Sequence, residues 1–112
     1  MSRRKVVAGN WKMNLSLDEA TELVKQVTAN GKNSAVEKIF FPPFPYLKTV
    51  NDLVINEQEF SVGGQNCSAK ASGAFTGEVA AKMLREVGCE YVLVGHSERR
   101  QYFNEDARQL RE

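Results

Sequence analysis

Strand-like and helix-like segments alternate along the chain. Short, mostly apolar segments predict four strands, at residues 5–9, 38–41, 60–64 and 90–95. Longer segments predict four helices, at residues 16–31, 46–54, 79–88 and 104–112. The strands begin about 28 residues apart, which is typical of βαβ units. This order predicts an α/β fold in which parallel strands are covered by helices.

Local signals mark the ends of several predicted helices. Ser16 and Glu19 have the spacing of a capping box, and Gly31 suits the position just after a helix. In the third helix, five apolar residues are expected to face inward: Val79, Ala80, Met83, Leu84 and Val87. Gly88 then ends that helix.

Composition limits the classes of protein that the chain can belong to. The 112 residues are 42% hydrophobic, which suits one domain with a core. A net charge of +1 gives no broad basic surface for nucleic acid. No apolar run approaches the roughly 20 residues of a membrane span, and the segment after Arg3 and Arg4 is too short for a secretory signal. We therefore expect a cytoplasmic protein with no nucleic-acid or membrane partner.

The two cysteines do not suggest a metal site. Cys67 and Cys89 are far apart in sequence, and His96 is the only histidine of the chain. One histidine and two distant cysteines make a poor zinc site, and a cytoplasmic protein keeps its thiols reduced. We expect both cysteines to be small buried apolar residues.

Parallel α/β folds place their chemistry at the carboxyl ends of the strands. Four loops follow predicted strands and should share that edge: 9–16, 42–45, 65–78 and 96–103. The first loop carries Asn10 and Lys12 on either side of Trp11. If both polar side chains point into the edge, Trp11 should pack away from it. Lys12 can hold an anion there, or it can be an ordinary surface lysine.

The fourth loop begins with His96 and continues with Ser97 and Glu98. A helical turn starting near Ser97, with Ser97 as its cap, would disfavour the imidazolium form. A neutral imidazole can donate a hydrogen bond to a developing enolate, although a histidine with a purely structural hydrogen bond is an alternative. Glu98, Arg99 and Arg100 suggest an ion-pair cluster, in which Glu98 could also hold Lys12.

The third loop, residues 65–78, is longer than the two to six residues usual for such a connection. It exposes Phe75 among small residues. A long ordered loop often serves as an arm for a partner or as a lid. The alternative is a flexible insertion.

Three motifs together resemble the triosephosphate isomerase family: GNWKMN (9–14), GAFTGE (73–78) and VGHSERR (94–100). The resemblance implies a parallel (β/α)8 TIM barrel, with residues 1–112 supplying about the first four βα units as the N-terminal half of one domain. It also implies a glycolytic and gluconeogenic enzyme, a homodimer in its full-length form. Such an enzyme interconverts dihydroxyacetone phosphate and glyceraldehyde 3-phosphate without cofactor or metal.

The resemblance also assigns roles to residues. Asn10 and Lys12 match the substrate-binding pair, with Lys12 electrostatically important. His96 matches the neutral catalytic electrophile, an established property of that enzyme and so no independent prediction. Glu98 matches a supporting carboxylate near Lys12. Phe75, Thr76 and Glu78 lie in the loop that matches the dimer-interface arm.

The chain departs from the family's pattern in what it lacks. A barrel of this kind needs about 250 residues and eight strands. No residue matches the family's glutamate base or its late glycine-rich phosphate loops, so we expect a truncated enzyme that is inactive alone. One alternative is a non-catalytic half-barrel that self-associates or pairs with a separate C-terminal half. Another is an independent flavodoxin-like domain, which would need a different strand order.

Overall fold

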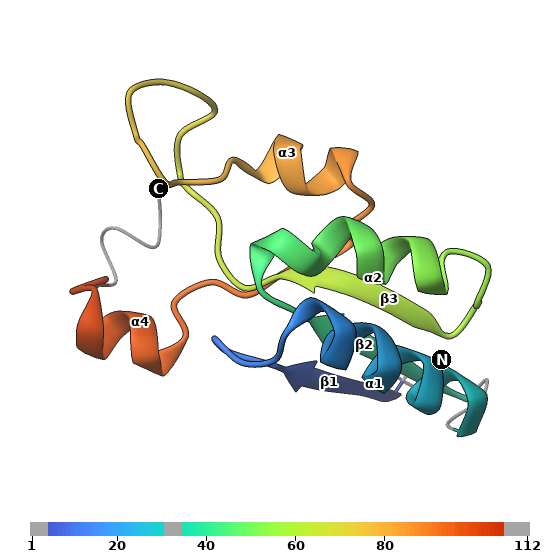
Figure 1. Cartoon of the computed structure of the whole chain (residues 1–112). Coiled ribbons are helices and arrows are strands. Elements are labelled where there is room, and N and C mark those ends of the chain that lie inside the picture. The colour runs from blue at the N-terminus through green and yellow to red at the C-terminus, as the bar shows by residue number, and fades with distance from the viewer. Residues whose placement is uncertain (1–4, 31–34, 107–112) are drawn as a thin grey trace.

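A computed structural model describes residues 5–30 and 35–106 of the chain, and strands and helices alternate through them (Figure 1). The strands are β1 (Lys5–Asn10), β2 (Val36–Phe41), β3 (Phe60–Gly64) and β4 (Tyr91–Val92). The helices are α1 (Leu17–Asn30), α2 (Leu47–Val54), α3 (Ala81–Glu86) and α4 (Ser97–Tyr102), with a 3-10 turn, η1 (Phe44–Tyr46), before α2.

The four strands form one parallel sheet in the order β1-β2-β3-β4. This sequential order is that of the first βα units of a TIM barrel, so the expected fold class is confirmed. The flavodoxin-like alternative is wrong. In that fold the first strand lies between the second and the third, whereas here β1 lies at the edge, next to β2. In Figure 1 the arrowheads of β1 and β3 point the same way, and the long segment after β3 and helix α4 lie at that end.

The core lies between the sheet and helices α1 and α2, which cover the same face (Figure 1). Its centre is aromatic: the Trp11 ring meets Phe40 edge-on at 5.9 Å, and Phe40 stacks on Phe60 at 5.8 Å. Val24 of α1 and Val50 of α2 close over these rings and are fully buried. Trp11 therefore packs into the core, as its place between Asn10 and Lys12 predicted.

The capping box at the start of α1 is confirmed. The Ser16 N–H donates to Glu19 Oε1 at 2.9 Å, and the Glu19 N–H donates to Ser16 Oγ at 3.2 Å. Hydrogen bonding of the Glu19 carboxylate to Ser16, mainly to its backbone N–H and secondly to its side chain, holds the pKa of Glu19 below its ordinary value. Gly31, the predicted end of this helix, lies outside the described residues.

Several predicted bounds were wrong. Strand β4 covers only Tyr91–Val92 of the predicted 90–95, because it pairs with β3 at just two positions. The chain then turns at Gly95, whose φ is +63°. Helix α3 is shorter than 79–88, and the Met83 side chain is 53% exposed instead of facing inward.

The last predicted helix also differs. Residues 104–106 are not helical, and the rest of the predicted 104–112 lies outside the described residues. A helix forms earlier instead, as α4. Among the residues in the two described ranges, no helix is long and apolar enough to cross a membrane.

Polar side chains from three strands meet near the amino-terminal half of the sheet. Glu37 Oε1 accepts hydrogen bonds from Ser61 Oγ at 3.2 Å and from Tyr91 Oη at 2.8 Å. Toward the other end, the sheet is too tight for a side chain at Gly63. A Cβ there would overlap Phe41 Cε1 and would lie 2.9 Å from the Tyr91 carbonyl oxygen.

The packing at Gly63 gives a stability prediction. Gly63→Ala should lower the free energy of unfolding by about 1–3 kcal/mol, since the added methyl group overpacks the site. Gly9→Ala is the matched control, because a Cβ there meets only Trp11 Nε1, at 4.0 Å. Urea titration followed by circular dichroism measures both. Equal free energies of unfolding for the two variants would contradict the prediction. They would mean that Phe41 and β4 move aside without an energetic cost.

Candidate active site at the carboxyl edge of the sheet

A cavity of about 260 Å³ lies at the carboxyl edge of the sheet. Its lining comes from the last residue of β1 and from the segments that follow β1, β2, β3 and β4: Asn10, Lys12, Met13, Phe44, Gln65, Asn66, His96, Glu98, Arg99 and Phe103. The cavity thus collects the four residues that the family resemblance assigned to substrate binding and catalysis, namely Asn10, Lys12, His96 and Glu98.

The loop after β1 holds Asn10 and Lys12 in a tight turn. Asn10 Oδ1 accepts a hydrogen bond from the Lys12 N–H at 2.9 Å, and Asn14 Nδ2 donates to the Trp11 carbonyl at 2.9 Å. Lys12 has a φ of +59°, a left-handed conformation that is uncommon for a residue with a side chain. The burial of Trp11 leaves its two polar neighbours at the edge, as cavity-lining residues.

Glu98 lies beside Lys12. Lys12 Nζ is 3.0 Å from Glu98 Oε2, so the contact expected between these side chains is confirmed. The two side chains are 52% and 43% exposed. An ion pair this exposed adds about 1 kcal/mol or less to stability. Its consequence is therefore geometric, because it holds the lysine ammonium beside Glu98, and both residues line the cavity.

His96 caps helix α4. Its Nδ1 accepts a hydrogen bond from the Glu98 N–H at 3.1 Å. The predicted cap, Ser97, is instead the first residue of the helix, because the helix begins one residue earlier than expected. An acceptor nitrogen carries no proton, so this bond places the ring proton of His96 on Nε2. Glu98 Oε1 lies 3.5 Å from the same nitrogen and would favour a proton on it. The contact with the Glu98 N–H is shorter, at 3.1 Å, and a backbone N–H can only donate.

The two arginines do not form the expected cluster with Glu98. Arg99 Nε donates to Glu105 Oε2 at 2.7 Å, and its guanidinium lies 4.7 Å from the centre of the Phe103 ring. Arg100 Nε donates to the Gly95 carbonyl at 2.9 Å. Helical geometry separates the three neighbouring side chains and leaves Glu98 facing Lys12.

Gln65 belongs to this site, although the sequence did not single it out. Its Nε2 donates at 2.8 Å to both the Lys12 carbonyl and the Phe41 carbonyl. The strand-end rule marked the loop that starts at Gln65, but no spacing relates this residue to Lys12. Only the parallel alignment of β1 and β3 brings the two together.

The long loop after β3 extends away from the sheet (Figure 1). A hydrogen bond of 2.7 Å from the Ser68 N–H to the Val79 carbonyl joins its two ends. Phe75, Thr76 and Glu78 are exposed on this loop and do not line the cavity that holds Lys12. Their assignment to a dimer interface stays a prediction.

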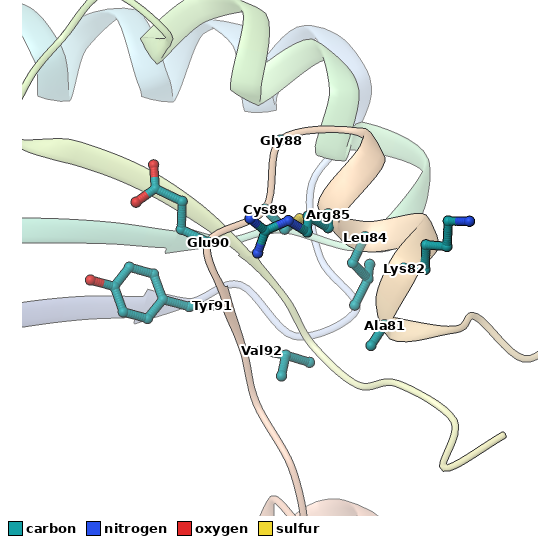
Figure 2. A pocket seen from close by; sticks show the side chains of 9 residues that line it. All are labelled: Ala81, Lys82, Leu84, Arg85, Gly88, Cys89, Glu90, Tyr91 and Val92. Carbon is teal, nitrogen blue, oxygen red and sulfur yellow. The ribbon is translucent and has the colours of Figure 1, made fainter. Parts of the chain in front are cut away.

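A larger hollow, of about 680 Å³, lies along α3 and β4 (Figure 2). Figure 2 shows the ends of two of its charged side chains, Lys82 and Glu90, pointing in opposite directions. Cys89 lines this hollow, and burial raises the pKa of its thiol. The smaller cavity is therefore the better candidate site, because its polar groups meet.

The remaining ligand donors are dispersed. Cys67 and Cys89 are free thiols, and burial raises the pKa of both. Within residues 5–30 and 35–106, no three His, Cys, Asp or Glu side chains are grouped so that they could hold a metal ion.

Comparisons with known proteins identify relatives of this chain. A sequence model of the triosephosphate isomerase family matches residues 5–112. A triosephosphate isomerase of Rhodopirellula baltica is 49% identical over 106 residues, which are 94% of this chain and 41% of the relative. One from Legionella pneumophila is 48% identical over 105 residues, and one from Clostridium botulinum is 47% identical over 103. These cover 93% and 92% of this chain.

The chain spans about two fifths of the length of these relatives, and that part is the N-terminal one. The match includes the segments that carry Asn10, Lys12, Gln65, His96 and Glu98. With a sequential parallel sheet and a family match over nearly its whole length, the chain belongs to the triosephosphate isomerase family.

Proposed function

We propose that this chain supplies the lysine and histidine part of a triosephosphate isomerase active site, which interconverts dihydroxyacetone phosphate and glyceraldehyde 3-phosphate through an enediolate. The observation that carries the proposal is the single cavity shared by Lys12, Glu98 and His96. Isomerisation moves a proton between adjacent carbons and builds negative charge on oxygen, so it needs donors and a cation beside that oxygen.

In this proposal His96 is the electrophile. Its Nδ1 accepts a hydrogen bond from the Glu98 N–H, so the proton on Nε2 is available to a ligand in the cavity. A neutral imidazole that donates this proton to the substrate carbonyl lowers the energy of the enediolate. The imidazole can then move protons between the two oxygens of the intermediate.

Lys12 and Asn10 hold the substrate in this proposal. The Lys12 ammonium attracts the phosphorylated triose and stabilises developing negative charge. Glu98 orients that ammonium through the 3.0 Å contact. Asn10 Oδ1 accepts the Lys12 N–H, so we assign the amide nitrogen of Asn10 to the ligand.

The carbon proton needs a base that these residues do not provide. Glu98 is engaged with Lys12, and no other carboxylate lines the cavity among the described residues. Loss of a general base costs about 10²–10⁴ in rate. We therefore expect the 112-residue chain to be inactive alone and to act together with the part of the barrel that its relatives have beyond the matched region.

A chimaera tests this function. Residues 5–112 replace the matching part of the Rhodopirellula baltica relative, and a coupled assay measures isomerisation of glyceraldehyde 3-phosphate. We expect activity in the chimaera and none in the 112-residue chain. A folded but inactive chimaera would contradict the proposal and favour a non-catalytic half-barrel.

His96→Asn tests the catalytic histidine. Asparagine is a good N-cap, so its Oδ1 can accept the Glu98 N–H in place of Nδ1. We expect kcat of the chimaera to fall by about 10²–10⁴, because the imidazole donor is lost, with little change in the melting temperature. A kcat within a factor of three of the parent would leave His96 only its capping role.

We further propose a homodimer for the full-length protein, with the loop that holds Phe75, Thr76 and Glu78 reaching the partner near its Asn10 and Lys12. The exposure of Phe75, 45%, supports this proposal, because an aromatic side chain on a projecting loop suits an interface. Sedimentation equilibrium of the chimaera should give twice the mass of one chain. A monomer at micromolar concentration would contradict the assignment of this loop to a dimer interface.

A further inference from the structure

The backbone of Lys12 is held in an uncommon conformation. Its φ of +59° is left-handed, and a residue with a side chain adopts it only where the surroundings impose it. The ammonium group at the end of the side chain has one exposed ion pair, with Glu98, which is weak. The direction in which the side chain leaves the loop therefore depends mainly on what fixes the backbone.

Two side chains form hydrogen bonds with that backbone, one from a neighbouring residue and one from a distant part of the chain. Asn10 Oδ1 accepts the Lys12 N–H, but Asn10 lies two residues away in the same turn. Gln65 comes from the end of β3, and its Nε2 donates to the Lys12 carbonyl at 2.8 Å. Only the second contact ties Lys12 to another part of the sheet.

The amide group of Gln65 suits this position. Its nitrogen has two hydrogens, and both nearby partners, the carbonyls of Lys12 and Phe41, only accept. The Phe41 carbonyl also accepts the Trp11 N–H at 3.1 Å, which extends the pairing of β1 and β2 by one residue. Gln65 thus joins the strained residue to the ends of two strands.

We propose that Gln65 is a positioning residue: it fixes the left-handed backbone of Lys12 and thereby sets the place of the lysine ammonium in the cavity. Gln65 acts through Lys12 and not on the substrate. The consequence for catalysis rests on the proposed isomerase function, whereas the consequence for the Lys12 backbone does not. Two measurements separate these statements.

The first measurement is amide hydrogen exchange on the 112-residue chain. Gln65→Met keeps the length of the side chain and removes both donors. We expect the Lys12 amide to exchange at least about tenfold faster, while the amide of the buried Val24 in α1 is unchanged. Gln65→Lys restores a donor and should recover part of the protection. Unchanged exchange at Lys12, or equal acceleration at Lys12 and Val24, would overturn the proposal.

The second measurement is a double-mutant cycle in the chimaera, read as kcat/KM. Lys12→Met removes a charge-assisted contact and should lower kcat/KM by about 10- to 100-fold or more. Gln65→Met should lower it by about 3- to 10-fold, and the double variant should match Lys12→Met alone. If the two losses multiply instead, Gln65 acts independently of Lys12 and the proposal is wrong.

Control variants complete the cycle. Lys48→Met removes a lysine with the same 3.0 Å ion-pair geometry, to Asp52 on α2, and should leave kcat/KM unchanged. Gln58→Met makes the same exchange at an exposed glutamine outside the cavity. An inactive parent chimaera would refute the isomerase function, and the exchange measurement would still decide whether Gln65 holds Lys12.

Discussion

Four strands that run in one direction bring four loops to a single edge of the sheet, and the contacts between loops in the candidate site depend on that alignment. Lys12 follows β1, Gln65 follows β3, and His96 and Glu98 follow β4. The Phe41 carbonyl at the end of β2 is shared by Trp11 and Gln65. The packing of α1 and α2 on one face of the sheet keeps the strands parallel. The hydrophobic core therefore determines where the polar side chains of the site meet.

The site combines a rigid frame with weak side-chain contacts. The Lys12–Glu98 pair is half exposed and contributes little stability, yet both backbones are fixed. Lys12 is held by Asn10 and Gln65, and Glu98 by the hydrogen bond of its N–H to His96. An ammonium on a fixed backbone keeps its direction while its tip stays accessible. That is the property which electrostatic stabilisation of a transient anion requires.

The edges of the sheet differ from its centre. Val7 in β1 and Val94 after β4 are 61% and 54% exposed, whereas Val62 in β3 is fully buried. An open edge also leaves backbone groups without strand partners, and closure into a barrel removes such edges. The family's curated relatives are more than twice as long as the matched segment, and we propose that the barrel of the full-length protein covers these strands.

The sequence alone determined the alternation of elements, the capping box at Ser16 and Glu19, and the residues that follow each strand, because these are local patterns of polarity and spacing. It also carried the motifs that resemble the family. The tertiary structure decided the strand order, the length of β4, the cap at His96 and the separation of Arg99 from Glu98. Gln65 could not be found from sequence, because its hydrogen bond to Lys12 joins loops that only the parallel sheet brings together.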